Sequence, residues 1–340
     1  MFQRILVPLD GSPGAERAIP VAASLVHQTS GSLVFLHIVA PTAALQSVAA
    51  LPDREASRTE AMERVMADAA SYLATIPVRY AKDLEGLLTE MDIAFGTASP
   101  TLHSAARQER ADLIVLCRHH EVGLGQWGLE SITQQVMRHS PVPLLILNEH
   151  EQNMPILDGR HPLRIVVPLD GSLFAETALE PALQMLSYCS AASPCELALV
   201  YVVDLFAGEG TGDEETHRSR YVTMQALQSA ESYLQAVAAH LSKRSDCRPQ
   251  SVHITCKVTS GVDIASTLLH QIHRTKGSDQ DVLPSLIAMA THGREGMLRL
   301  AMGSVAERLL NATTAPLLTM CPKETMVRRI NFALPIPGKN

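Results

Sequence analysis

The sequence predicts an α/β protein built from two tandem domains, each with a doubly wound, five-stranded parallel sheet. Two observations carry this prediction. The nine residues 4–12 recur almost unchanged at 164–172, with the ending Pro-Leu-Asp-Gly-Ser in both copies. In each copy, apolar strand patterns then alternate with amphipathic helix patterns. A chain of 340 residues is also too long for one ordinary α/β domain and suits two.

The first copy gives its elements in a regular order. An Ala-rich helical pattern runs from Ser12 to about Gln28, and a long helix at 54–75 places Met62, Met66 and Leu73 on one face. Gly96 precedes a third helix, and a fourth helix separates the last two strands. After the opening strand, the expected strands of this copy are 33–39, 92–95, 112–116 and 142–147.

The second copy repeats this order with insertions. The tripeptide Ser-Tyr-Leu of the first long helix, around Tyr72, recurs around Tyr233 in the helix expected at 218–241 and keeps the two copies in register. Pro20 and Pro181 lie inside helical patterns, so each predicts a kink or a delayed helix start. The strands expected after 164–169 are 197–203, 252–258, 286–289 and 316–320.

The copies set the domain boundaries. We expect a first domain at 1–148, a polar linker with Pro155 and Gly159 at 149–161, and a second domain at 162–322. The tail at 323–340 contains Ile330 and Phe332, which favour a strap across the surface over a disordered end.

Composition narrows the class of protein. The net charge of −7 and the 4% aromatic content disfavour binding to nucleic acid or to a membrane surface. No apolar run approaches the ~20 residues of a membrane span, and the N-terminus has no leader pattern. Six cysteines without a C-x2-C pair are expected to be reduced thiols. We therefore expect a cytoplasmic protein.

A glycine-bearing loop in the second copy predicts an anion site. It follows the strand at 286–289 and leads into a helix that begins near Ser304, where Ser304 and Glu307 have the spacing of a capping box. Gly293 and Gly303 let the backbone approach a ligand closely or adopt positive φ. The helix N-terminus would then bind a phosphate. The alternative is a loop that only packs on its neighbours.

A second polar turn strengthens the phosphate interpretation. Asp170, Gly171 and Ser172 follow the first strand of this copy, and Ser172 is suited to N-cap the next helix. Two strand ends with such turns are what a nucleotide site at the switch point of an open α/β sheet requires.

These motifs resemble those of the universal stress protein family. Its nucleotide pattern is G-x2-G-x9-G-[ST], and Ala290, Gly293, Gly303 and Ser304 fall on the four positions, with alanine replacing the first glycine. The resemblance implies the adenine nucleotide α-hydrolase-like fold with strand order 3-2-1-4-5, and ATP as cofactor, with Mg²⁺ left open. The residues that it implies for the ATP site are Pro168, Asp170, Ser172, Val202, Ala290, Gly293, Arg294, Gly303 and Ser304.

The resemblance also implies how the domains assemble. Single-domain members of this family pair through their last strands, so the tandem chain resembles a covalent version of that dimer. The segments 142–147 and 316–320 are apolar edge strands that such pairing would cover. A homodimer of the whole chain stays open.

The first copy has lost the glycine pattern. Aligned on Ser131, the glycine positions hold Cys117, His120 and Glu130, and Glu130 would put a carboxylate where a phosphate would lie. We expect no ATP in this copy. Cys117, His119 and His120, with His139 or Glu130, could form a metal site, but their spacing favours exposed imidazoles, and we predict no metal.

The sequence favours a regulatory protein over an enzyme. It has no phosphate-binding G-x4-G-K-[ST] loop and no nucleophile elbow, and we assign no catalytic residue. We expect an ATP-binding stress-response protein with one nucleotide in the second domain and little turnover. The alternatives are a slow ATPase or phosphotransferase, and a nucleotide-free scaffold whose first domain binds another small molecule.

Overall fold

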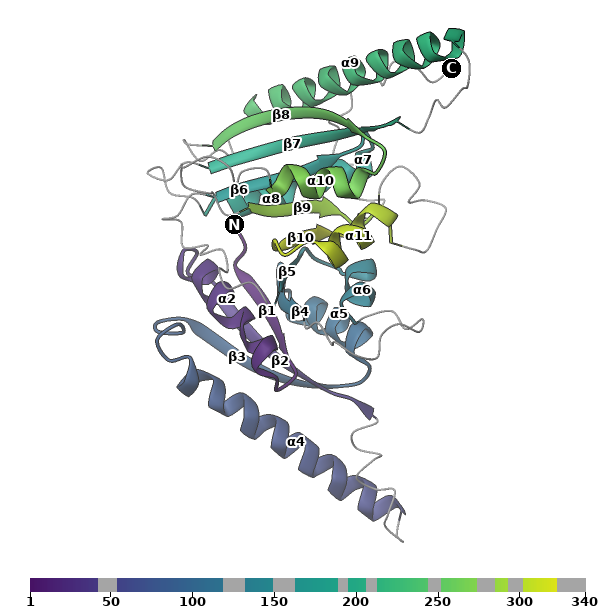
Figure 1. The fold of residues 1–340 in the computed structure, drawn as a ribbon. Coiled ribbons are helices and arrows are strands. Elements are labelled where there is room, and N and C mark those ends of the chain that lie inside the picture. The colour runs from purple at the N-terminus through teal and green to yellow at the C-terminus, as the bar shows by residue number, and fades with distance from the viewer. Residues whose placement is uncertain are drawn as a thin grey trace. The chain divides into compact units, whose positions relative to one another are not determined.

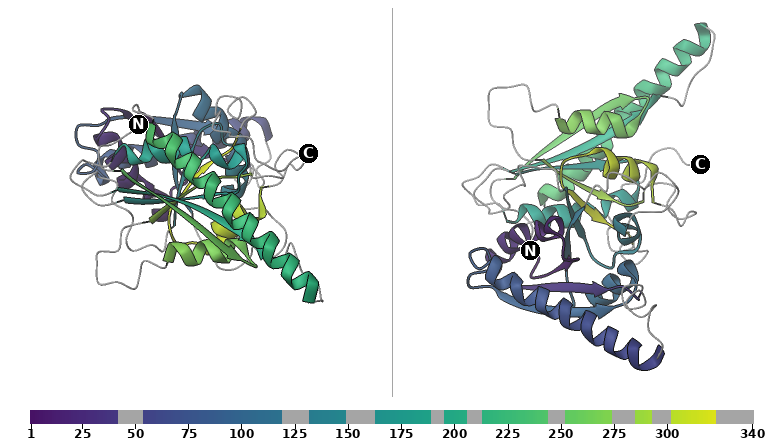
Figure 2. Two further views of the ribbon diagram at one scale, coloured as in Figure 1. Left: turned by 90° about the horizontal axis from the view of Figure 1, so that it is seen from above. Right: turned by 60° about the horizontal axis from the view of Figure 1, so that its bottom comes forward.

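The chain forms two compact units, residues 1–158 and 159–340. Figures 1 and 2 show their ribbons in a computed structural model. The linker at 149–161 and the tail at 323–340 fall outside the described residues, so their predicted bounds stay predictions. The structure describes residues 1–41, 54–118, 132–148, 163–188, 195–205, 213–243, 252–273, 285–292 and 302–322.

The first unit is a parallel sheet in the order β3-β2-β1-β4-β5. Helices pack on both of its faces, with α2 and α4 on one and α5 and α6 on the other (Figure 1). The predicted order 3-2-1-4-5 is confirmed. The elements are β1 (Arg4–Leu9), α1 (Pro13–Glu16), α2 (Ala18–His27), β2 (Ser32–Val39), α4 (Arg54–Arg79), β3 (Leu88–Phe95), α5 (Ala98–Gln108), β4 (Leu113–Arg118), α6 (Ile132–His139) and β5 (Leu144–Asn148).

The second unit repeats this topology as β8-β7-β6-β9-β10, again with all strands parallel. The predicted strand order is confirmed here as well. The elements are β6 (Leu163–Leu169), α7 (Leu173–Glu176), α8 (Leu179–Leu186), β7 (Cys195–Asp204), α9 (Asp213–Lys243), β8 (Val252–Gly261), α10 (Ile264–His273), β9 (Ser285–Ala290), α11 (Ser304–Ala312) and β10 (Leu317–Met320).

The central strands form the core of each unit. Every residue of β4 is buried, and Ile5, Leu6 and Val7 of β1 are inaccessible to solvent. In contrast, β3 and β8 are only partly covered, and both are longer than predicted. Their exposed faces carry polar residues such as Glu90, so the continuous apolar run that marks a buried strand is absent at their ends.

The two prolines delay helix starts, as predicted. The pattern expected as one helix from Ser12 to Gln28 is split into α1 and α2, with Pro20 in the first turn of α2. Pro181 lies likewise in the first turn of α8. A proline is tolerated there because the first N–H groups of a helix have no intrahelical acceptor.

One expectation about the cysteines is wrong. Cys195 is disulfide-bonded, whereas Cys117, Cys256 and Cys321 are not in disulfide bonds. A disulfide depends on the distance between two Cα atoms in the fold, which cysteine spacing in a sequence does not give.

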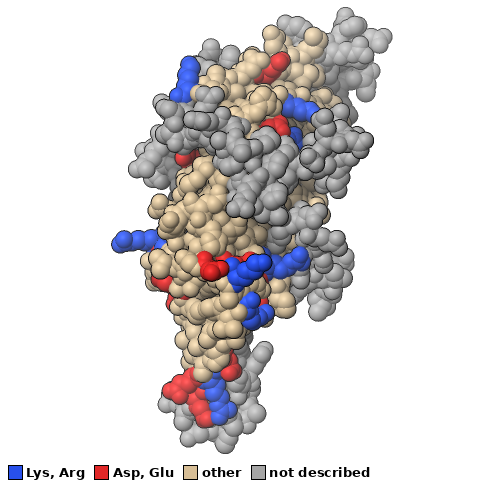
Figure 3. Space-filling model, turned by 90° about the vertical axis from the view of Figure 1, so that its left-hand side faces the viewer, with Lys and Arg blue, Asp and Glu red and all other residues tan. Residues whose placement is uncertain are grey.

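The exposed charges of the described residues are mixed. On the face drawn in Figure 3, basic and acidic side chains lie interspersed. None of the described helices is long and apolar enough to cross a bilayer. The predicted pairing of 142–147 with 316–320 concerns the placement of the two units and stays a prediction.

Candidate functional site

The Asp-Gly-Ser turn after β6 is held by its own side chains. Asp170 Oδ1 accepts hydrogen bonds from the backbone N–H of Ser172, at 2.9 Å, and from its hydroxyl, at 2.6 Å. The Ser172 Oγ in turn accepts from the N–H of Ala175, at 3.1 Å, and so caps α7 as predicted. Gly171 has φ 83°, a conformation in which a side chain would be strained. The turn therefore fixes Asp170 at the carboxyl end of β6.

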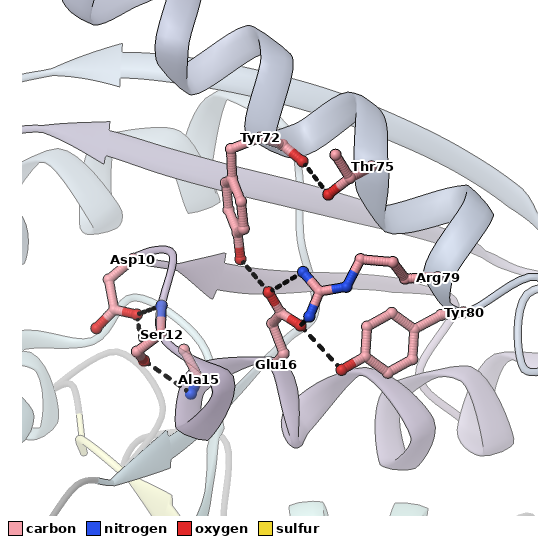
Figure 4. Close-up of polar contacts among 8 residues, drawn as sticks. All are labelled: Asp10, Ser12, Ala15, Glu16, Tyr72, Thr75, Arg79 and Tyr80. Carbon is pink, nitrogen blue, oxygen red and sulfur yellow. Dashed lines mark hydrogen bonds and ion pairs between the residues drawn. The ribbon is translucent and has the colours of Figure 1, made fainter.

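The first unit builds the same turn. Asp10 Oδ1 accepts from the N–H and the hydroxyl of Ser12 at 2.9 and 2.6 Å, and Ser12 Oγ accepts from Ala15 N–H at 3.1 Å (Figure 4). Gly11 has φ 88°. The turn is thus a shared structural device of the fold, and its presence alone does not distinguish a ligand-binding unit from an empty one.

The strand pairing marks a switch point beside this turn. Pairing between β6 and β9 ends at Val166 with Ile287. Beyond it, β6 pairs only with β7 up to Leu169, and β9 pairs only with β10 up to Ala290. The connections leave to opposite faces, which is the arrangement that accommodates ligands at the carboxyl ends of an open α/β sheet. Pro168 lies in this stretch, where its missing N–H removes no bond to β9.

Helix α11 begins at the predicted place but by a different cap. Its N-cap is Gly303, no side chain caps it, and Ser304 is its first helical residue. The predicted capping box of Ser304 with Glu307 is therefore wrong by one position. The cause is a closure of the loop, because the Gly303 N–H donates to the Thr291 carbonyl at 2.9 Å and the Glu307 N–H donates to the Gly303 carbonyl at 3.0 Å.

Within the described residues, neither the backbone conformation nor the packing at position 303 requires a glycine. Its φ of −61° suits any residue, so the predicted option of positive φ is wrong at this position. A Cβ there would lie 3.4 Å from the Thr291 carbonyl oxygen, an ordinary contact. The N-terminus of α11 thus carries backbone N–H groups without a side-chain cap, next to the end of β9.

Of the other residues predicted for the ATP site, two are described by the structure and two lie outside the described residues. Ala290 ends β9 and is buried, and Val202 is buried in β7, one residue beyond the last pairing of β7 with β6. The hydroxyl of Tyr201 donates to the Asp170 carbonyl at 3.2 Å, which ties β7 to the turn. Gly293 and Arg294 lie outside the described residues, so their predicted roles stay predictions.

The first unit differs at the end of β4. Cys117 and Arg118 occupy the positions of Ala290 and Thr291, and both are buried. Arg118 Nε donates to the Asn148 side-chain oxygen at 3.1 Å, and burial lowers the pKa of this guanidinium. Arg118 was not predicted as a site residue, although it lies in the segment that is aligned on Ser131.

Most of the altered loop of the first unit falls outside the part of the chain that the structure describes. His119, His120, Glu130 and Ser131 lie outside the described residues. Among the residues that the structure does describe, no group of three metal-ligating side chains comes together.

A buried carboxylate cluster was missed from the sequence. Glu16, one turn after Ser12 in α1, is 1% exposed and accepts hydrogen bonds from the hydroxyls of Tyr72 and Tyr80, both at 3.0 Å (Figure 4). Arg79 reaches the same carboxylate at 2.8 and 2.6 Å. Burial, and then the bond to Glu16, raises the pKa of both tyrosines. The recurring Ser-Tyr-Leu tripeptide was the available signal, because its tyrosine makes this contact.

Comparisons with known proteins agree with this fold. The model of the universal stress protein family matches residues 1–148 and 163–320. Universal stress protein Sll1654 of Synechocystis is 33% identical over 149 residues, which cover 43% of this chain and 86% of that protein. The solved structure of a universal stress protein from Archaeoglobus fulgidus has a TM-score of 0.58 at 15% identity, covering 95% of this chain and 97% of that one. A putative universal stress protein from Pseudomonas aeruginosa has a TM-score of 0.56 at 14% identity, covering 96% of each chain.

Proposed function

We propose that this chain, which belongs to the universal stress protein family, binds one ATP in its second unit and acts as a nucleotide-dependent regulatory protein. The observation that carries the proposal is the switch point at β6 and β9. It joins a carboxylate-bearing turn to an α-helix whose N-terminus has no side-chain cap. A nucleotide requires both features, since one end bears hydroxyl and amino donors and the other bears phosphate charge.

The phosphates are assigned to the N-terminus of α11. The N–H groups of its first turn, with the positive end of the helix dipole, stabilise negative charge there. The Gly303 N–H is already bonded to Thr291, so Gly303 contributes by its small size, and the donors come from Ser304 onward. Gly293 and Arg294 would complete the phosphate end of this site.

The nucleoside is assigned to the other side of the switch point. The Asp170 carboxylate, held by Ser172, accepts hydrogen bonds from the hydroxyl groups of the sugar. The main chain at Val202 faces the base. Val202 lies in β7, one residue beyond the last pairing of β7 with β6. Pro168, Ser172 and Ala290 shape the backbone around these groups.

The first unit is proposed to bind no ATP. It keeps the Asp10 turn, but it places the buried Arg118 where the second unit has Thr291, and Glu130 where the second unit has Gly303. A carboxylate at the start of the following helix would repel the phosphates.

Calorimetry and mass spectrometry test this proposal. Titration of ATP into the full chain, with and without Mg²⁺, should give one site per chain, and the nucleotide should be identified in the purified protein by mass spectrometry. Asp170→Asn should lower the affinity about tenfold or more, because an uncharged amide is the weaker acceptor. The matched variant Asp10→Asn should leave it unchanged.

The same experiment has outcomes that contradict the proposal. Two equivalent sites, equal effects of Asp170→Asn and Asp10→Asn, or no binding at all would refute it. Phosphate release measured with Mg²⁺ separates the regulatory role, for which turnover is negligible, from the alternative of a slow ATPase.

A further inference from the structure

Each unit buries one glutamate at the same place, in the short helix after its Asp-Gly-Ser turn. Glu16 in α1 is 1% exposed and Glu176 in α7 is 2% exposed. An isolated charge at such depth is unfavourable, so each carboxylate must be paired, be bonded several times, or be protonated.

The first unit pairs its glutamate with a cation. Tyr72, Arg79 and Tyr80 extend from the end of α4 and together supply two hydroxyl donors and a guanidinium (Figure 4). Helix α4 continues past Pro77 to Arg79, beyond the end predicted at Thr75, and so brings these groups within reach. Glu16 is therefore an ion-paired carboxylate.

The second unit keeps only one of these three donors. Tyr233, the counterpart of Tyr72, donates its hydroxyl to Glu176 Oε1 at 2.9 Å. Counted from the shared tyrosine, the positions of Arg79 and Tyr80 are held by His240, which is exposed, and Leu241, which is buried. Glu176 Oε2 is buried and has no hydrogen-bond partner in the described part of the chain.

Among the described residues, the groups around Glu176 do not supply the missing positive charge. From α9 it faces Tyr233, and from the turn after β6 the negative Asp170 acts on it. From β7, Tyr201 contacts the Tyr233 ring edge-on, with centroids 6.1 Å apart. The described residues of β9 have no titratable side chain, and Arg164 at the opposite end of β6 pairs with Glu196 at 3.0 Å. Burial first, and then Asp170, raises the pKa of Glu176, against the opposing bond from Tyr233.

We propose that Glu176 is a carboxylic acid in the folded second unit at neutral pH, and that loss of its proton loosens this unit. A buried neutral hydroxyl without an acceptor is much less unfavourable than a buried charge without a counterion. In the second unit the proton compensates the charge of the buried carboxylate, as the Arg79 guanidinium does in the first unit. Because Tyr233, Tyr201 and Asp170 connect Glu176 to the turn, the second unit carries a pH-sensitive element next to its candidate site.

The direction of the pH dependence follows from the raised pKa. In the unfolded chain Glu176 loses this proton near the ordinary pKa of a glutamate, about 4.3. In the folded unit it keeps the proton to a higher pH. Between those two values the unfolded state binds fewer protons, so stability falls as pH rises. The contribution is fully present below about pH 4.3 and is lost once the folded group has ionised.

Infrared spectroscopy of the full chain, titrated from pH 5 to pH 9, tests the proton directly. A carbonyl stretching band of a protonated carboxyl group should be present at pH 7, decline toward the alkaline end, and vanish in Glu176→Gln. It should persist in the matched variant Glu16→Gln. If the band is absent at pH 7 or is unaffected by Glu176→Gln, the proposal is wrong.

Hydrogen exchange by mass spectrometry tests the structural consequence. After correction for intrinsic exchange, protection of α7 and α8 should fall by up to about tenfold per pH unit within the titration window, relative to α1 and α2. The double variant His240→Arg, Leu241→Tyr places the arginine and the tyrosine of the first unit at the corresponding positions of the second. It should make the protection of α7 and α8 less dependent on pH and remove the infrared band. Equal pH profiles for both units in the unaltered protein would overturn the proposal, even if Glu176→Gln fails to fold. None of these measurements needs ATP, so they stand apart from the proposed function.

Discussion

The two units share a backbone device and differ in the charges around it. Both hold an aspartate at the end of their first strand by the same two hydrogen bonds, and both cap the following helix by a third bond to the serine hydroxyl. The first unit then buries Arg118 at the end of β4 and pairs Glu16 with Arg79. The second unit has Thr291 and a Glu176 oxygen that no described residue bonds at these places.

This difference shows which parts of a duplicated fold can diverge. The turn and its cap set the strand-to-helix geometry, and losing them would cost both units stability. The charges on neighbouring positions are not needed for that geometry. The first unit places two guanidinium groups at these positions, the buried Arg118 and the half-exposed Arg79, whereas the second unit has Thr291 and the exposed His240.

The largest effect is expected from removing the cation of the first unit. Arg79→Ala leaves Glu16 buried with only two hydroxyl donors, which should reduce the free energy of unfolding of that unit by about 2–4 kcal/mol. This loss in the free energy of unfolding is smaller than the loss expected for a fully buried ion pair, because the Arg79 side chain is 48% exposed. Hydrogen exchange of the α1 and α2 amides measures it.

The matched variant in the second unit is His240→Ala. Since His240 is exposed, the loss there should stay within about 0.5 kcal/mol. Similar losses from both variants would mean that the two glutamates have equivalent surroundings, contrary to the contacts described above.

A smaller effect is expected from charging the start of α11. Gly303→Glu places at the start of α11 the residue that the first unit has at the aligned position, Glu130. It should weaken ATP binding by about 1–2 kcal/mol more than Gly303→Gln does, or roughly 5- to 30-fold in Kd. The backbone tolerates both side chains, because φ is −61° and the added Cβ makes an ordinary contact. Calorimetry with ATP measures the difference.

Gly303→Gln adds a side chain of similar size without the charge, and it therefore controls for steric effects. Equal affinities of Gly303→Glu and Gly303→Gln would show that no phosphate lies near this helix N-terminus. In the first unit, Glu130→Gly alone should create no second ATP site, because His120 still replaces a glycine of the sequence pattern.

The fold was predictable because its signals are local. The repeat at 4–12 and 164–172, with alternating strand and helix patterns, led to the strand order that both units have. The ends of β3 and β8 were missed because exposed edge strands lack a continuous apolar run.

The site was predictable only in part, because its remaining features depend on contacts between distant residues. Tyr72 meets Glu16 across 56 positions, and Tyr233 meets Glu176 across 57. No spacing rule connects a residue in a short helix to one near the end of a long helix. The glycine pattern indicated Gly303, but its place as the N-cap of α11 is shown by its extended backbone and by the bond that its carbonyl accepts from the Glu307 N–H.

The smallest effect concerns that cap. As the first helical residue, Ser304 makes no capping bond, so Ser304→Ala should change the stability of the second unit by no more than a few tenths of a kcal/mol, aided by the helix propensity of alanine. Ser172→Ala, which removes both the cap of α7 and a bond to Asp170, should cost about 1 kcal/mol. Urea unfolding followed by exchange of the α7 and α11 amides compares the two. An equal cost for both serines would restore Ser304 as the N-cap, and with it a side-chain acceptor at the helix end where the phosphates are proposed to bind.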